Sequence, residues 1–141
     1  MAVVESADKA DAFKEEANKF FKDGDYDKAI EKYTEALAVK ESAVYFSNRS
    51  LAYLRTECFG YALEDASKAI ALDNSYIKGY YRRAMVYMAL EKFKEALQDL
   101  ETVRLSIVCD TLYFELHIPF PFSHMPLDFI PVFEVLINIC A

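Results

Sequence analysis

The sequence predicts an all-α protein, an α-solenoid in which antiparallel helix pairs repeat and stack. Three observations lead to this prediction. Small and aromatic residues recur at a period of about 34 residues through positions 10–104. All four prolines lie at or after Pro119, so the preceding chain contains no proline to break a long helix. Hydrophobic residues make up 54% and charged residues 28% of the chain, which is typical of a globular protein and not of a disordered one.

The repeat becomes visible when the segments that begin at Ala10, Ala43 and Ile77 are aligned. The recurring positions are Ala17, Phe20, Ala29, Tyr33 and Ala36 in the first segment, Ser50, Tyr53, Ala62, Ala66 and Ala69 in the second, and Ala84, Tyr87, Ala96, Leu100 and Val103 in the third. The small residues allow the two helices of a pair to approach closely, and the aromatic rings fill the space between them. Because a single pair cannot bury its apolar face, neighbouring pairs must stack. The period is that of the tetratricopeptide repeat, a helix-turn-helix unit.

Each predicted helix is bounded by this pattern and by turn residues such as those at 22–25 and 56–60. The helices expected in chain order are 7–22 and 26–39 in the first repeat, 43–56 and 59–72 in the second, and 77–89 and 93–105 in the third. The predicted organisation is a lead-in at 1–9, repeats at 10–42, 43–76 and 77–104, and an irregular apolar tail at 105–141.

The sequence changes character after Arg104. All 16 lysines and arginines lie at or before this residue, whereas both histidines and all the prolines follow it. The segment 105–141 is apolar, acidic and without the repeat pattern, and we expect no charged capping helix in it. Without cations to meet anionic lipids, its phenylalanines predict a loosely packed tail, with a partner-binding face or a membrane-surface element as alternatives. An alternative transcript end, read-through into non-coding sequence and a gene-model artefact remain open as its origin.

Charge and composition argue against several classes of function. A net charge of −7 does not suit a nucleic-acid partner. The three cysteines are too scattered for a disulfide framework, and Cys109, His117 and His124 lack a recognised zinc spacing, so we expect neither a metal nor a cofactor. No apolar run reaches the roughly 18 residues of a membrane span, and the N-terminus does not resemble a signal peptide. We expect a reducing compartment: the cytoplasm, with the nucleus as an addition.

Five polar residues fall in phase on the first helices of the three repeats, which line the concave face of such a solenoid. Lys14 and Asn18 are separated by four residues and share a helix face, and Lys78 and Arg82 repeat this spacing, while Asn48 lies midway along the helix between them. Three cations and two amides in one groove suit a carboxylate ligand. Capture of a peptide's C-terminal carboxylate is a known recognition mode. The alternative is that these are ordinary surface charges, but their recurrence across three repeats favours the groove.

These five residues match the dicarboxylate clamp of repeat proteins that bind the acidic C-terminal tails of Hsp90 and Hsp70. The segments 47–63 and 76–84 resemble the N-terminal repeat domain of the serine/threonine-protein phosphatase 5 family, and the similarity covers about residues 8–104. The resemblance implies a domain that docks on Hsp90 and also covers and inhibits its own catalytic domain. It further implies that Glu57, in the turn 55–58, is a regulatory contact, although an ordinary turn carboxylate explains this residue equally well.

The chain departs from that family in one respect that bears on activity. It contains neither the Gly-Asp-x-His-Gly nor the Gly-Asn-His-Glu motif that supplies the metal ligands of the family's catalytic domain. We therefore predict that this chain is not an enzyme. Three functions remain: a module that binds an acidic chaperone peptide, a regulatory part that acts on a phosphatase catalytic domain absent from this chain, and a scaffold without clamp activity.

Overall fold

The computed structural model describes residues 2–115 of the chain, with side chains from 5 to 107. Its internal contacts divide the chain into two units, Met1–Val108 and Cys109–Ala141. The first unit holds the repeats and every predicted site residue. Within the described residues, no helix combines the length and the hydrophobicity that a membrane span needs.

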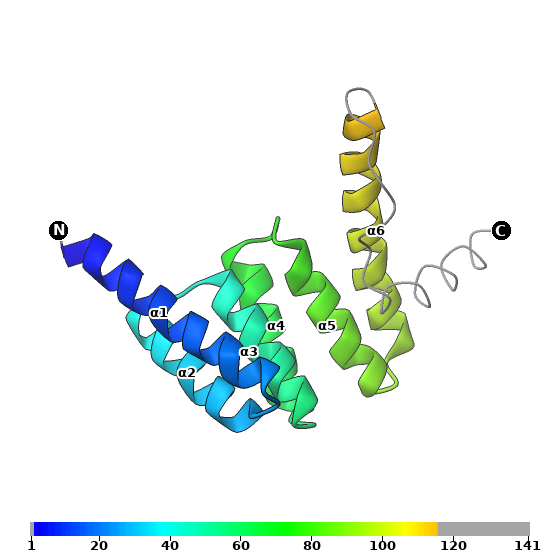
Figure 1. The fold of residues 1–141 in the computed structure, drawn as a ribbon. Helices are drawn as coiled ribbons and strands as arrows, with labels where there is room; N and C mark the ends of the chain where they lie inside the picture. Colours follow the sequence, from blue (N-terminus) through cyan, green and yellow to red (C-terminus); the bar gives the residue numbers. More distant parts are fainter. Residues whose placement is uncertain (1, 116–141) are drawn as a thin grey trace. The chain divides into compact units, whose positions relative to one another are not determined.

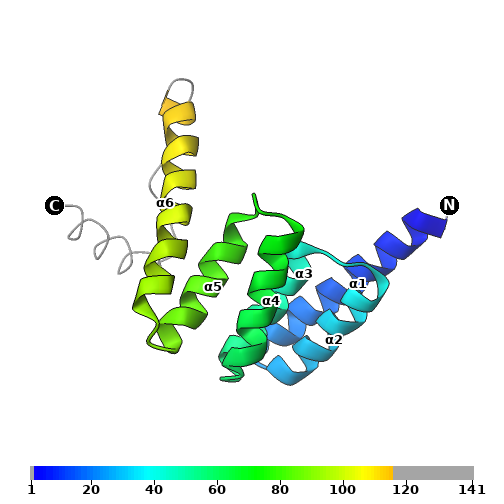
Figure 2. The same ribbon diagram turned by 180° about the vertical axis from the view of Figure 1, so that it is seen from behind.

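Residues 2–115 form six helices and no strand, as the all-α prediction requires. In chain order the helices are α1 (Ala2–Lys22), α2 (Tyr26–Val39), α3 (Ala43–Arg55), α4 (Phe59–Leu72), α5 (Ile77–Ala89) and α6 (Phe93–Glu115). Helix α1 pairs with α2 and α3 pairs with α4, while α2 also contacts α3 and α4 contacts α5. The two opposite views in Figures 1 and 2 show this side-by-side order along the solenoid from α1 to α5.

The four middle helices begin and end within one residue of their predicted bounds. Two outer ends differ. Helix α1 begins at Ala2 and not at residue 7. Glu5 lies in its first turn, where a negative charge interacts favourably with the positive end of the helix dipole. Helix α6 continues to Glu115, so the prediction of an irregular tail is wrong for residues 105–115. This stretch contains no glycine or proline that would end a helix. The predicted tail at 116–141 lies outside the described residues, and the repeat boundaries remain predictions.

The turn within each repeat uses one backbone geometry three times. Gly24, Glu57 and Glu91 occupy equivalent positions and have positive φ angles of 81°, 60° and 58°. The residue after each of them donates its backbone N–H to a carbonyl five residues back, which is the Schellman arrangement that ends a helix. These bonds are Asp25 N to Phe20 O at 2.9 Å, Cys58 N to Tyr53 O at 2.9 Å, and Lys92 N to Tyr87 O at 2.8 Å. Only the first turn has the glycine that adopts this φ without strain.

Alanines form the contacts between the helices. Ala17 and Ala29 are fully buried against Tyr33, and Ala10 and Ala36 are fully buried against Tyr45 of the next repeat. Helix α5 also approaches α4 closely, because a Cβ atom on Gly79 would lie 3.1 Å from Cγ1 of Ile70. The predicted role of the small residues is therefore confirmed in the first repeat, and the small residues of the second repeat are also fully buried: Ser50, Ala62, Ala66 and Ala69.

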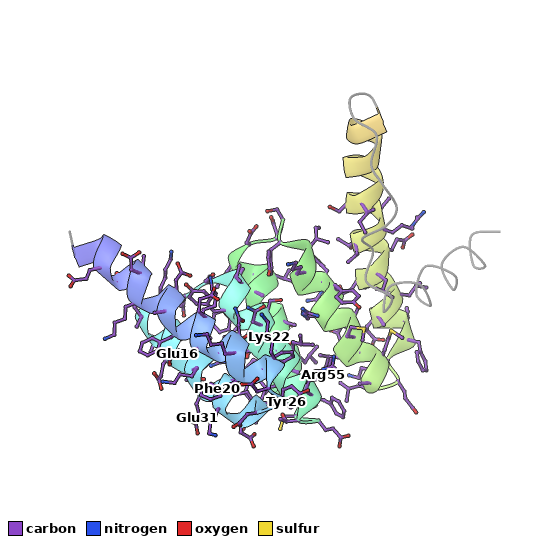
Figure 3. All side chains as sticks on the ribbon, in the orientation of Figure 1. Glu16, Phe20, Lys22, Tyr26, Glu31 and Arg55 are labelled. Carbon is purple, nitrogen blue, oxygen red and sulfur yellow. The ribbon has the colours of Figure 1, made fainter. Side chains whose placement is uncertain are left out.

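An ion pair joins the two helices of each repeat at equivalent positions. In the second repeat Arg49 donates to both carboxylate oxygens of Asp65, at 2.7 and 2.8 Å. In the third, Arg83 makes the same two bonds to Asp99, both at 2.7 Å. The first repeat has the charges in the opposite order: Glu16 lies on α1 and Lys32 on α2, with an Nζ–Oε2 distance of 3.3 Å. Figure 3 shows Glu16 and Phe20 projecting from α1 on the side where α2 lies.

Candidate peptide-binding site

The predicted site residues lie on the first helix of each repeat. Helix α1 carries Lys14 and Asn18, α3 carries Asn48, and α5 carries Lys78 and Arg82. Helices α3 and α5 contact one another directly as well as through α4. The first helices of the second and third repeats are therefore neighbours, as a shared groove requires.

Arg82 has the environment of a cation that lacks its counterion. Its Nε is buried and has no hydrogen-bond partner within the part of the chain that the structure describes. Burial lowers the pKa of the Arg82 guanidinium, and the nearby positive charge of Arg55 acts in the same direction. Arg49 and Arg83, in contrast, each hold a buried aspartate with two bonds. Because a buried donor without a partner is costly, an anion that reaches Arg82 would relieve this cost.

Asn18 is tied to the second helix of its own repeat. The hydroxyl of Tyr33 donates a hydrogen bond of 2.6 Å to Oδ1 of Asn18. Tyr33 is only 2% exposed, and burial raises the pKa of its hydroxyl to about 12. The charge of Arg82 also acts on this hydroxyl, so residues of α1, α2 and α5 come within electrostatic reach of one another here.

Carboxylates of the described residues already hold Lys14, one of the three predicted cations. Its Nζ lies 3.1 Å from Oδ1 of Asp11 and 3.3 Å from Oε1 of Glu15, both on α1. The hydrogen bond to Asp11 is the main cause that raises the pKa of Lys14. Asp11 accepts a second bond, of 2.8 Å, from the hydroxyl of Tyr45 on α3. An acidic ligand at Lys14 would compete with these two carboxylates.

The remaining predicted residues are more open to solvent. Asn48 is half-buried midway along α3, and Lys78 is exposed one turn before Arg82. Glu57 is exposed in the turn after α3, in the left-handed conformation described above. The structure thus joins Asn18 to Tyr33 by a hydrogen bond, with Arg82 acting on Tyr33 only through its charge. The ligand-binding role of all five groove residues and the regulatory role of Glu57 remain predictions. The arrangement can bind an anion through N–H donors and positive charge.

Sequence reasoning missed Tyr33 and Asp11 as members of this site. The repeat pattern assigns Tyr33 to packing between helices, a role that its ring does perform. A signal for more was present, because the equivalent positions in the other repeats hold Ala66 and Leu100, which carry no hydroxyl. Asp11 gave no such signal, since its contact with Tyr45 spans 34 residues of sequence.

Comparison with known proteins yields relatives of two kinds, although no protein-family model matches the chain. Human serine/threonine-protein phosphatase 5 is 58% identical over 96 residues, which are 67% of this chain and 19% of that protein. Mouse DnaJ homolog subfamily C member 7 is 43% identical over 97 residues, which are 65% of this chain and 20% of that protein. This chain therefore spans about a fifth of the length of these relatives, and in the phosphatase the matched part is the repeat region.

Solved structures with the same fold match far more completely. The second repeat domain of Spaghetti (RPAP3), solved bound to the HSP90 peptide SRMEEVD, is 38% identical with a TM-score of 0.68, over 74% of this chain and 95% of that one. The second repeat domain of human RPAP3, solved in complex with the HSP70 peptide SGPTIEEVD, is 40% identical with a TM-score of 0.68, over 72% and 85%. The chain thus belongs to the tetratricopeptide-repeat domains and is homologous to the repeat regions of serine/threonine-protein phosphatase 5 and RPAP3.

Proposed function

We propose that this chain is a protein-binding module that clamps the acidic C-terminal peptide of a chaperone of the Hsp90 or Hsp70 type. The observation that carries the proposal is the buried Nε of Arg82, which has no hydrogen-bond partner among the described residues, whereas Arg49 and Arg83 each pair with a buried aspartate. The peptides bound to the two RPAP3 domains support the choice of ligand, since both end in the acidic sequence Glu-Glu-Val-Asp.

The chemistry of the groove fits the two carboxylates at the end of such a peptide. Arg82 and Lys78 supply positive charge from α5, and the amides of Asn18 and Asn48 supply neutral N–H donors from α1 and α3. Lys14 joins them when the ligand displaces Asp11 and Glu15. A negative net charge of the whole chain does not oppose this proposal, because these cations lie on the first helices and the ligand meets them at short range.

Calorimetry with the peptide SRMEEVD and the full chain tests the proposal. Removing one partner of a desolvated charge pair costs about 2–5 kcal/mol, so Arg82→Ala should weaken binding by at least about 30-fold. The variant should stay folded and melt close to the parent, because the buried Nε makes no hydrogen bond with the described residues and the contact that is lost is that of Cζ over the Tyr81 ring, 5.8 Å from its centroid. Lys94→Glu, an exposed change on α6, is the matched control and should leave affinity within about two-fold. Equal affinity of the parent and Arg82→Ala would refute the clamp.

A second candidate function rests on Glu57 and on the 58% identity with the phosphatase. In this proposal the chain inhibits a phosphatase catalytic domain through the exposed turn at Glu57, in the cytoplasm or the nucleus, and has no phosphatase activity of its own. Adding the full chain to an isolated catalytic domain of phosphatase 5 tests it. Inhibition that Glu57→Gln abolishes, and that the control Glu91→Gln leaves intact, would support it. Unchanged turnover would reject it.

A further inference from the structure

Asn18 has two chemically different ends, and the fold has already engaged one of them. Its Oδ1 accepts the 2.6 Å hydrogen bond from Tyr33. The Nδ2 of the same planar amide lies on the side away from Oδ1 and carries two N–H donors. An exposed asparagine can adopt either of two amide orientations. Asn18 is half-buried on α1 and bonded to Tyr33, and this contact favours one of them.

Tyr33 donates in this bond, and its hydroxyl stays able to donate at ordinary pH. Because the pKa of its hydroxyl is raised to about 12 by burial, the proton stays on the oxygen through the neutral range. The ring is packed between Ala17 and Ala29 and is 2% exposed, so the hydroxyl has little freedom to turn away. The bond it makes holds Asn18 in the orientation in which the carbonyl oxygen faces Tyr33.

The location of the bond joins it to the anion site. The charge of Arg82 acts on the Tyr33 hydroxyl, and Asn18 and Arg82 both lie on the first helices of their repeats. In the proposed clamp, a ligand carboxylate held by Arg82 also meets the amide that Tyr33 orients. With the carbonyl oxygen of Asn18 occupied, this amide presents N–H donors to an anion and hides the oxygen that would repel it.

We infer that Tyr33 is a positioning residue of the carboxylate site, which holds Asn18 with its N–H groups toward the C-terminal carboxylate of the ligand. The inference rests on the proposed function and deepens it, because it states how a residue that does not touch the ligand sets the affinity. It also explains why a tyrosine stands at this one repeat position, where the other repeats have Ala66 and Leu100.

A double-mutant cycle with the full chain tests the inference. Tyr33→Phe keeps the ring and removes the hydroxyl, and the loss of one pre-ordered side chain should weaken binding of SRMEEVD by about 2- to 12-fold. In an Asn18→Ala background the same change should have an effect below about two-fold, because no amide is left to orient. A peptide amidated at its C-terminus should show a smaller effect of Tyr33→Phe than the free acid does.

Tyr53→Phe is the matched control. Tyr53 occupies α3 and is half-buried, with its ring 5.3 Å from that of Tyr61 on α4, on the side that faces the second helix of its repeat. Its loss of a hydroxyl should leave affinity unchanged. An undiminished effect of Tyr33→Phe in the Asn18→Ala background would overturn the inference, and so would wild-type affinity of Tyr33→Phe itself.

Asn18→Asp provides a second arm that decides the matter even where Tyr33→Phe fails to fold. It retains an oxygen acceptor for Tyr33 but has no N–H donor, so it should melt higher than Asn18→Ala and yet lose peptide binding. Wild-type affinity of Asn18→Asp, or a melting temperature at or below that of Asn18→Ala, would overturn the inference. Arg82→Ala distinguishes failure of the inference from failure of the proposed function. If Arg82→Ala abolishes peptide binding and Tyr33→Phe leaves binding unchanged, the clamp is supported and only the positioning role of Tyr33 is refuted.

Discussion

Burial predicts that the ion pairs of the three repeats differ greatly in what they contribute to stability. Arg49→Met preserves much of the apolar stem of the side chain and removes the guanidinium. It leaves Asp65, 3% exposed, without the two bonds that hold its carboxylate. Breaking a buried pair from one side costs about 3–5 kcal/mol, because the remaining charge stays buried and unpaired. Since a domain of this size is stable by about 5–15 kcal/mol in total, the loss should be a large fraction of the whole.

The first repeat contains the matched control for this experiment. Lys32→Met removes the cation of the equivalent pair, but its partner Glu16 keeps 52% of its side chain exposed and is readily hydrated. An exposed pair contributes about 0–1 kcal/mol. Urea denaturation followed by circular dichroism should therefore give a free energy of unfolding that falls several-fold more for Arg49→Met than for Lys32→Met.

A compensating variant separates the loss of the charge pair from the loss of packing. Replacing both partners, in Arg49→Met with Asp65→Leu, removes the stranded carboxylate and should recover most of the lost stability. Equal losses in Lys32→Met and Arg49→Met would show that burial does not determine the contribution of these pairs. A double variant as unstable as Arg49→Met would show that the cost lies in packing, and either result would refute the reasoning.

Three further predictions follow from single contacts. Glu57→Gly should raise the free energy of unfolding by about 0.5–1 kcal/mol, because residue 57 has a positive φ of 60° that glycine adopts without strain. Gly24→Ala at the equivalent turn should lower the free energy of unfolding by a similar amount. Thermal melting measures both changes, and the same sign for both would contradict the prediction. Asp11→Asn should strengthen binding of SRMEEVD by about two- to five-fold in calorimetry, because it removes a carboxylate that competes for Lys14, and unchanged or weaker binding would exclude that competition. The pKa of Tyr33 is raised from 10.0 to about 12 in the folded chain. The protonated hydroxyl therefore contributes fully to the free energy of unfolding below pH 10, and this contribution is lost as the pH rises to 12. With allowance for solvent screening this loss is about 1–2 kcal/mol, and denaturation of the parent and Tyr33→Phe across this range should differ by that amount; parallel curves would rule it out.

Periodicity was sufficient to place the helices because each repeat has the same small residues and the same turn geometry. Gly24 marks the first turn, and the alignment carries its position to Glu57 and Glu91, which have the same positive φ without being glycine. The extension of α6 to Glu115 was not predicted, because the change in composition after Arg104 was interpreted as a change in structure. A loss of charge does not end a helix when no glycine or proline follows closely.

Contacts between side chains far apart in sequence could not be read from the period. Arg49 and Asp65 are separated by 16 residues, and only the approach of α3 to α4 brings them together. The same holds for Tyr33 and Asn18, which are separated by 15 residues. The five residues of the groove were predicted from their phase on first helices, whereas the residues that hold and compete for them depend on tertiary packing.

The reversed charge order in the first repeat restricts how the chain can misassemble. Exchange of second helices between the first two repeats would place Glu16 opposite Asp65 and Lys32 opposite Arg49, so both crossed pairs would bring like charges together. Exchange between the second and third repeats would instead match arginine with aspartate again. Repeat proteins are prone to such swaps because their units are alike. Electrostatic repulsion thus disfavours exchange of helices with the first repeat during folding. The misassembly to be expected is exchange of second helices between the second and third repeats.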